Sequence, residues 1–238
     1  MKAVLLRIYQ LLDDHYGPLH WWPADTKDEV AIGAILVQNV TWSNTIKAID
    51  RLRDAGLLTL ESLVDAPLTH VEACVVSTRF YKMKAKKLQA FAVHFSTKWN
   101  GDWQRLQKAG LAVARPDLLS VWGIGPETAD DILLYAAALP TFVVDAYTTR
   151  IFTRLGIVSE GIRYEPLRTL FMDYLEPDTA LYNQYHALID ALGHRVCLNK
   201  QPRCSACPVL ALCAHGQAAN PVPSIPKTAT PRHSATAD

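Results

Sequence analysis

The sequence lacks the long apolar runs and the strand patterns that several protein classes require. No apolar stretch reaches the roughly 18 residues that a membrane-spanning helix needs. The N-terminal stretch contains acidic residues and no small-residue cleavage site, so it indicates an amphipathic helix rather than a signal peptide. Strand signals are nearly absent and no internal repeat is found. We therefore expect a cytoplasmic, all-α protein without a membrane partner.

A large excess of charge of either sign is also missing. The chain carries 24 Lys and Arg against 23 Asp and Glu, a net charge of +1, so the composition alone does not indicate a nucleic-acid partner. Basic residues nevertheless cluster locally, and either a solvated helix face or a nucleic-acid contact would explain this clustering. The clusters are Lys82, Lys84, Lys86 and Lys87 in one segment, and Arg150 and Arg154 one helical turn apart.

Helix signals recur along the chain, and half of its residues are hydrophobic, which is enough for a real core. Thr26 and Glu29 fit a capping box before a long apolar run. Pro116 and Pro126 each suit the first turn of a helix. Further helices are predicted over residues 44–52, 82–95, 147–155, 166–174 and 180–192. The composition near the C-terminus turns to Ala, Pro, Thr, Ser and His, which predicts a flexible tail over 214–238.

Four of the five cysteines lie close together near the C-terminus, while Cys74 stands alone in an apolar stretch that indicates a core position. The four have the spacing C-x6-C-x2-C-x5-C, and in a reducing cytosol such a loop indicates a metal centre rather than disulfides. Zinc and a [4Fe–4S] cluster both accept four thiolates. A single C-x2-C pair favours the cluster. The predicted ligands are Cys197, Cys204, Cys207 and Cys213.

A glycine turn separates two predicted helices in the middle of the chain. One helix is expected to end at Trp122 and the next to start at Pro126, with Gly123 and Gly125 between them. The glycines leave backbone amides bare at a helix N-terminus, where the helix dipole favours an anion such as a phosphate. Twenty residues further on, Asp145 follows an apolar segment. It could be a plain helix N-cap, or a carboxylate held in place for a second role.

The order G-I-G-P-E-T-A-D, then V-V-D, then the four cysteines resembles the endonuclease III, or helix–hairpin–helix Gly/Pro-Asp, superfamily over nearly all of residues 1–213. This resemblance implies two helical lobes with double-stranded DNA bound in the cleft between them. A six-helix barrel containing the hairpin would span 26–139, and a lobe with a [4Fe–4S] cluster would combine 1–25 and 140–213. Gln38 looks like the family residue that fills the gap left by a flipped base.

One position departs from the bifunctional members of that family. They carry a lysine two residues after the last hairpin glycine, where this chain has Glu127, so strand cleavage through an amine is not expected. The 3-methyladenine DNA glycosylase III branch has glutamate there and also resembles this chain around Trp22, Trp42 and Phe80. Two features differ from that branch. Some of its members lack the cysteine cluster, and Arg79 replaces a glycine.

The matched residues imply a chemistry for a damaged base that has left the helical stack. Trp22 and Trp42 would sandwich a cationic methylated purine, with a cation–π contribution of about 0.5 to 2 kcal/mol. Asp145 would stabilise the positive charge that develops on the sugar and position a water molecule. Glu127 would line the pocket or order that water. The predicted DNA contacts are Gly123, Gly125, Lys84, Lys86 and Arg150.

The sequence therefore predicts a monomeric, nucleoid-associated base-excision-repair enzyme. We expect a monofunctional N-glycosylase for alkylated purines, with a structural cluster whose loop residues Lys200 and Arg203 either reach phosphates or are solvated. One alternative is another activity in the same superfamily, on oxidised pyrimidines or mismatches, with weak abasic-site cleavage. The other is a DNA-binding paralogue without catalysis.

Overall fold

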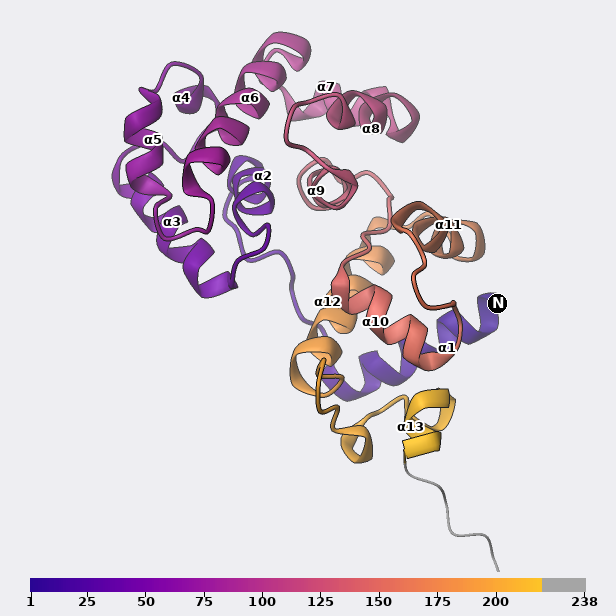
Figure 1. The fold of residues 1–238 in the computed structure, drawn as a ribbon. Helices are drawn as coiled ribbons and strands as arrows, with labels where there is room; N and C mark the ends of the chain where they lie inside the picture. The colour runs from indigo at the N-terminus through magenta and orange to yellow at the C-terminus, as the bar shows by residue number, and fades with distance from the viewer. Residues whose placement is uncertain (220–238) are drawn as a thin grey trace, which may run out of the picture.

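The computed structural model describes residues 1–219, and this part of the chain is helical without any strand, as predicted (Figure 1). None of its helices combines the length and the apolar character that crossing a membrane requires. The buried apolar residues form two separate clusters, so the molecule has two lobes with a core each. Cys74 is buried in the first core, as its apolar surroundings indicate.

The first lobe is built around α2 (Lys27–Leu36), which is buried along most of its length. Its start is fixed by Thr26, whose side chain accepts the Glu29 N–H at 3.1 Å. The Glu29 carboxylate accepts the Asp25 N–H at 3.3 Å instead of closing the capping box on Thr26. The helices around α2 are α3 (Trp42–Asp54), α4 (Leu60–Val64), α5 (Leu68–Cys74), α6 (Tyr81–Trp99), α7 (Trp103–Ala109), α8 (Leu111–Leu119) and α9 (Pro126–Asp131).

The hairpin between α8 and α9 differs from the prediction at its first helix. That helix ends at Leu119 and not at Trp122, whose side chain is exposed. Pro116 lies inside α8 rather than in its first turn, because the helix already begins after Gly110. The second helix starts at Pro126 as predicted and continues into a π-helical turn, η1 (Ile132–Ala136).

The second lobe combines the N-terminal helix with the C-terminal third of the chain (Figure 1). Leu5, Ile8 and Leu12 of the first helix share one core with Tyr182 and Tyr185. The helical segments of this lobe are α1 (Lys2–Tyr16), α10 (Ala146–Leu155), α11 (Tyr164–Tyr174), α12 (Thr179–Arg195), η2 (Cys204–Ala206), η3 (Leu210–Leu212) and α13 (Ala214–Ala219). The N-terminus is therefore part of the core of this lobe.

The last helix, α13, occupies the first residues of the segment predicted to be a flexible tail. Residues 214–219 are helical, and Gly216 lies close to the preceding loop, where an added Cβ would lie 2.7 Å from Leu210 Cδ1. The predicted tail therefore does not begin at 214. The rest of that prediction, 220–238, lies outside the described residues.

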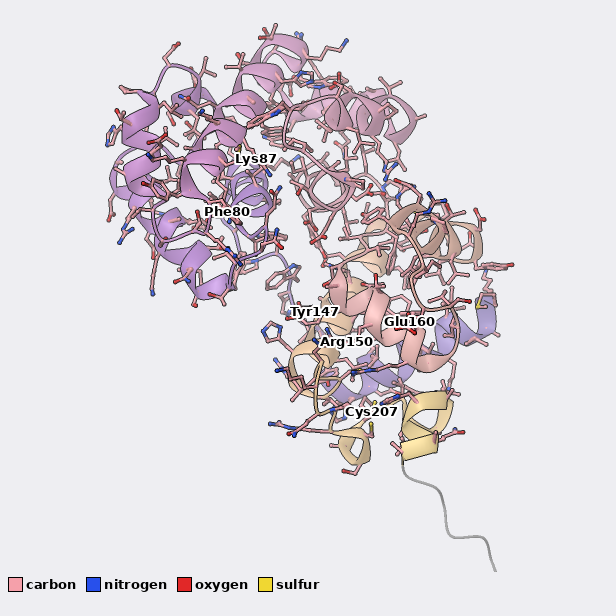
Figure 2. All side chains as sticks on the ribbon, in the orientation of Figure 1. Phe80, Lys87, Tyr147, Arg150, Glu160 and Cys207 are labelled. Atoms are coloured by element: carbon pink, nitrogen blue, oxygen red, sulfur yellow. The ribbon has the colours of Figure 1, made fainter. Side chains whose placement is uncertain are left out.

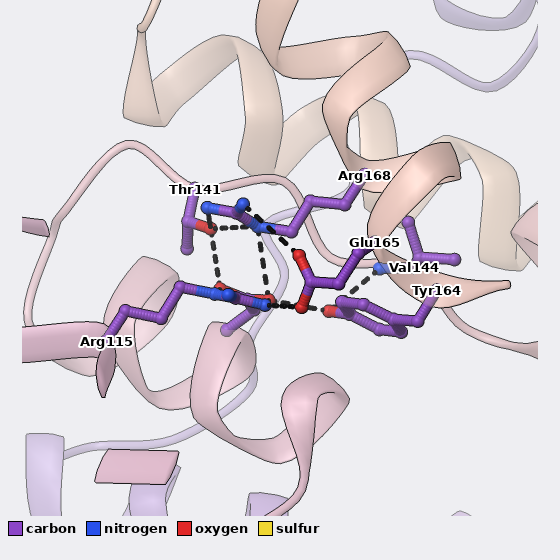
Figure 3. A network of polar contacts seen from close by, with 7 residues as sticks. Arg115, Thr141, Val144, Tyr164, Glu165 and Arg168 are labelled. Atoms are coloured by element: carbon purple, nitrogen blue, oxygen red, sulfur yellow. Dashed lines mark hydrogen bonds and ion pairs between the residues drawn. The ribbon is translucent and has the colours of Figure 1, made fainter. Parts of the chain in front are cut away.

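A network of ion pairs and hydrogen bonds around a buried carboxylate joins the two lobes (Figure 3). Asp130 of α9 is fully buried and accepts two hydrogen bonds from Arg115 of α8, at 2.8 and 2.9 Å. From the second lobe, the Arg168 Nε atom lies 3.3 Å from this carboxylate and the Tyr164 hydroxyl donates to it at 2.8 Å. The segment between η1 and α10 contributes Thr141, which donates at 2.6 Å. Asp130 thus fixes the segment that leads into α10.

Candidate active site

A pocket of about 1180 Å³ opens between the two lobes. It is lined by the loops on either side of α2, by the hairpin and α9, and by the start of α10 and one face of α12. The structure brings together at this pocket every residue that the sequence assigned to catalysis or to base binding. These residues are Trp22, Gln38, Trp42, Glu127 and Asp145, and the hairpin glycines Gly123 and Gly125 lie beside them.

Asp145 is the N-cap of α10, and its two carboxylate oxygens have different surroundings. Oδ1 accepts the backbone N–H of Thr148 at 2.6 Å and the hydroxyl of the same residue at 2.7 Å. Oδ2 lies 4.0 Å from Nε2 of His186 on α12. The capping interpretation and the catalytic interpretation are therefore compatible, because one oxygen caps the helix and the other is left for the pocket.

Two further acids line the same wall on α9. Glu127 is in the first turn, where the enclosing pocket walls and then the nearby Asp145 carboxylate raise its pKa to about 7. Its side chain is open to solvent in the free protein, so this shift reflects a concave and charged setting rather than complete burial. Asp131 is buried, and burial followed by the carboxylates Glu127, Asp145 and Asp130 raises its pKa well above the ordinary range.

The tryptophans of the pocket form a cluster and not a sandwich. The rings of Trp22 and Trp42 lie 5.4 Å apart at an interplanar angle of 83°, so they meet edge to face. Trp21 packs against both rings. Trp22 also lies on α2, where a Cβ at Gly33 would be 3.3 Å from its ring. The two rings line the pocket as predicted, but they contact one another and leave no space between them for the base that they were predicted to sandwich.

Gln38 lies at the mouth of the pocket and is held at both ends of its amide. Its Nε2 donates to the Thr128 hydroxyl at 2.8 Å, and its Oε1 accepts from Lys87 Nζ at 2.6 Å. Lys87 also packs against Gly123, so this lysine connects the hairpin to Gln38. Burial lowers the pKa of Lys87. The sequence placed Lys87 in a basic cluster but gave it no role in the site.

Comparison with known proteins identifies the family. The model of the HhH-GPD superfamily of base excision DNA repair proteins matches residues 32–177, which include the hairpin and Asp145. The chain belongs to the HhH-GPD superfamily. It is similar to MJ1434 of Methanocaldococcus jannaschii, which carries the provisional name of a DNA repair glycosylase, with 37% identity over 88% of this chain and 96% of that protein.

Two solved structures resemble this HhH-GPD protein in fold. One is a trapped covalent intermediate of endonuclease III with DNA, with a TM-score of 0.79, 21% identity and coverage of 92% of this chain and 98% of that chain. The other is Helicobacter pylori 3-methyladenine DNA glycosylase bound to 1,N6-ethenoadenine, with a TM-score of 0.72, 25% identity and coverage of 82% and 99%. The protein is thus a DNA repair glycosylase of the endonuclease III type.

The basic residues predicted to contact DNA have different positions in this HhH-GPD protein. Lys84 is only 2% exposed and donates to the Leu36 carbonyl at 2.7 Å, and burial lowers its pKa to about 8. The prediction of a surface contact is wrong for Lys84, because α6 turns it inward to cap α2. Lys86 is exposed but does not line the pocket.

Arg150 projects from α10 beside Tyr147 (Figure 2) and does not line the pocket. Its guanidinium donates to the carbonyls of Cys197 and Gly193, at 3.0 and 3.1 Å, and lies over the Tyr147 ring at 4.8 Å. Arg150 therefore braces the cysteine loop against α10, a contact that the sequence did not indicate.

The four cysteines lie on the loop between α12 and α13 (Figure 2 labels Cys207). Within residues 1–219 no three His, Cys, Asp or Glu side chains are placed as a group that could hold a metal ion, and this placement does not distinguish zinc from a cluster. N–H groups do point at their sulfur atoms. Arg154 donates to Cys197 Sγ at 3.3 Å, and Gly216 N–H donates to Cys213 Sγ at 3.3 Å. Hydrogen bonds of this kind accompany cluster thiolates.

Burial, together with the other three cysteines, raises the pKa of Cys207 to about 11. Four thiolates on this loop therefore need a positively charged centre to balance them. The donor set and its hydrogen bonds fit an iron–sulfur cluster, in which each thiolate binds its own iron atom.

Three residues that line the pocket were missed by the sequence argument, namely Lys87, described above, and His186 and Asp131. His186 accepts or donates a hydrogen bond with the Tyr135 hydroxyl at 2.7 Å through Nδ1 and faces Asp145 through Nε2. Asp131 lies one helical turn after Glu127 on the same helix face, a spacing that could have indicated a second acid. Nothing in the sequence around His186 indicates that it approaches the pocket.

Proposed function

We propose that this chain is a monofunctional DNA N-glycosylase that hydrolyses the glycosidic bond of alkylated purines, of the 3-methyladenine type, in double-stranded DNA. The observation that carries the proposal is the pocket itself, in which Asp145 and Glu127 face a cluster of indoles. Position 127, which holds the amine in bifunctional relatives, carries a carboxylate. Similarity to the Helicobacter pylori 3-methyladenine DNA glycosylase supports this choice of substrate.

The reaction needs positive charge to be stabilised on the sugar while the base leaves. Asp145 supplies a fixed negative charge because α10 holds its carboxylate in place before any substrate arrives. Glu127, with a pKa of about 7, can accept a proton from an attacking water near neutral pH. An alkylated purine is already cationic and needs little further protonation to leave, and the electron-rich indole faces attract it.

DNA would bind across the opening between the lobes. The bare amides of the hairpin at Gly123 and Gly125 suit a backbone phosphate. Gln38 would enter the duplex behind the flipped base, since it already lies at the pocket mouth. Similarity to endonuclease III structures that contain DNA supports this arrangement. Lys86 is free to reach the DNA backbone, whereas Arg150 acts through the loop that it braces.

The cysteine loop would hold a [4Fe–4S] cluster through Cys197, Cys204, Cys207 and Cys213. The cluster, when bound, would supply a structural cross-link and take no part in hydrolysis. Arg154 and Arg150 attach the loop to α10, so the cluster and the helix that carries Asp145 would stabilise one another. A yellow-brown purified protein with visible absorbance would support iron–sulfur, and a colourless protein containing zinc would contradict it.

The test is release of free 3-methyladenine from methylated duplex DNA. We expect release by the wild-type protein, and none by Asp145→Asn although that variant still binds DNA. Borohydride should trap no covalent complex, because only an amine forms a reducible imine. Absence of release from methylated DNA, or unchanged release by Asp145→Asn, would contradict the proposal. A trapped complex that disappears in Lys87→Met would instead indicate a lyase built on the lysine at the pocket mouth.

A further inference from the structure

Buried polar atoms without a hydrogen-bond partner are concentrated in the pocket. Four such side-chain atoms occur within residues 1–219, and three of them belong to pocket-lining residues. They are Trp22 Nε1, Asp131 Oδ1 and His186 Nε2. An unpaired buried polar group lowers the stability of the folded state, so its retention needs an explanation. Trp22 Nε1 lies against Gly33 of α2, whereas Asp131 and His186 line the pocket, where a ligand can reach them.

Asp131 differs from its neighbour Asp130 in having no hydrogen-bond partner at one carboxylate oxygen. Both carboxylates are buried and both belong to α9. Asp130 has two arginines, a threonine and a tyrosine as partners, whereas Asp131 Oδ1 has none. The charged groups that act on Asp131 are all carboxylates, namely Glu127, Asp145 and Asp130. Within residues 1–219, no cationic side chain is therefore among the groups that act on Asp131, and an ionised carboxylate there lacks the counter-charge that burial requires.

The donor and acceptor pattern of the unpaired atoms restricts the ligand. Burial and the neighbouring carboxylates favour the protonated form of Asp131 in the free protein, and a cation bound beside it would favour the ionised form. The ionised carboxylate can only accept, so it requires a donor on the ligand. The adenine edge presents an exocyclic amino donor beside the ring acceptor N7, while the same edge of guanine presents two acceptors. His186 Nε2 suits either partner because its tautomer depends on the bond between Nδ1 and Tyr135.

We propose that Asp131 is a specificity-determining residue that accepts a hydrogen bond from the amino group of a cationic adenine-type base and supplies its counter-charge. This inference rests on the proposed glycosylase function and adds a way to reject normal adenine. Undamaged adenine has the same amino group but no positive charge. Its binding therefore leaves the negative charge of the pocket carboxylates without a counter-charge.

The experiment is a binding titration that requires no bond breaking. The full-length protein is titrated with 3,9-dimethyladeninium, a permanent cation, and separately with neutral 9-methyladenine, and quenching of tryptophan fluorescence reports binding at the indole cluster. We expect the wild-type protein to bind the cation at least about tenfold more tightly than it binds neutral 9-methyladenine. An opposite charge at hydrogen-bonding distance gives an energy difference of this size. The same titrations are repeated with Asp131→Asn, which keeps the shape of the side chain and removes its charge.

The matched control is Asp190→Asn, since Asp190 also lines the pocket but has His186, His194 and Arg195 to balance it. We expect Asp131→Asn to lose the preference for the cation and Asp190→Asn to keep it. Equal binding of both ligands by the wild-type protein, or an unchanged preference in Asp131→Asn, would overturn the inference. Asp131→Ala, which also removes the charge, is the second variant if Asp131→Asn does not fold, and it should lose the same preference. The titration gives its answer even if the chain releases no base from DNA, so the two proposals fail separately.

Discussion

Asp145 illustrates how one carboxylate can serve both the fold and the chemistry. Its Oδ1 accepts two hydrogen bonds from Thr148 at the start of α10, and its Oδ2 faces the pocket. Because capping holds the side chain in one orientation, little reorganisation is needed when charge develops on the sugar. The two roles can be separated by substitution, since asparagine caps helices as well as aspartate does.

Replacing Asp145 by alanine and by asparagine should therefore give different stabilities and the same loss of activity. We expect Asp145→Ala to lower the free energy of unfolding by about 1 kcal/mol, and Asp145→Asn to change it far less. Both should reduce base release by at least about 10²-fold. Urea unfolding and single-turnover release measure the two effects. An active Asp145→Asn variant would mean that the charge at this position is not needed.

Glu127 should make base release depend on pH near neutrality. Its pKa is raised from the ordinary 4.5 to about 7, so the ionised form that accepts a proton becomes populated as pH rises through about 7. The single-turnover rate should rise between about pH 6 and pH 8 and then level off. In Glu127→Gln this step should disappear. A rate that falls over the same range would show that the protonated acid is the active form.

The raised pKa of Glu127 should also make the stability of the protein depend on pH, with stability falling where activity rises. Between pH 4.5 and about 7 the native state retains the Glu127 proton that the unfolded chain releases, so stability should fall as pH rises through this window. Thermal unfolding of the wild-type protein and of Glu127→Gln over this range would show the difference. An identical pH dependence in the two proteins would mean that the native pKa is not raised.

The hairpin element depends on one glycine more than on the other. Gly123 has a φ of 87°, a left-handed conformation that non-glycine residues adopt at a cost of about 1 to 2 kcal/mol. A Cβ there would also lie 2.4 Å from Lys87 Cγ. Gly125 has a φ of −92° and nothing within 4 Å of an added Cβ.

We therefore expect Gly123→Ala to destabilise the protein by about 1 to 2 kcal/mol and Gly125→Ala to have a smaller effect. Displacement of Lys87 in the first variant should also release Gln38 and weaken DNA binding. Denaturant unfolding measures stability, and fluorescence anisotropy with a duplex measures affinity. Equal losses of stability in both variants would contradict the assignment of the strained position.

Local signals identified some elements, and other elements needed the whole fold. The starts of α2, α9 and α10 were predicted because a capping side chain or a first-turn proline fixes each of them within a few residues. The short helices α4, α5 and α7 were not predicted, because helices of 5 to 7 residues are stabilised by packing and not by their own sequence.

The residues of the site also fall into two groups, those that a local motif predicts and those that only packing brings to the pocket. Asp145, Glu127 and Gln38 belong to local motifs and were found from the sequence. His186 and Lys87 reach the pocket only because α12 and α6 pack beside it, so spacing along the chain contains no sign of them. The edge-to-face contact of Trp22 with Trp42 likewise depends on how the loop before α2 packs.

At the scale of the whole molecule, Asp130 connects the lobes. Arg115 and Arg168 are only 14% and 12% exposed, so removing the carboxylate between them leaves two cations largely out of water. Asp130→Asn should lower the free energy of unfolding by about 3 to 5 kcal/mol. Asp131→Asn is the matched control, because an unpaired buried carboxyl stabilises nothing in the free protein. Guanidinium unfolding that gives equal losses for the two variants would contradict this role for the network.

The composition of the second lobe has a consequence for biosynthesis. Tyr185 donates to the Leu5 carbonyl, a partner 180 residues away in the sequence. On the ribosome, α1 therefore emerges long before the helices that cover Leu5, Ile8 and Leu12. The contiguous first lobe can fold while translation continues, but the nascent N-terminal helix must wait with its apolar face uncovered. Chaperone capture of ribosome-bound chains should end only when α12 has left the exit tunnel.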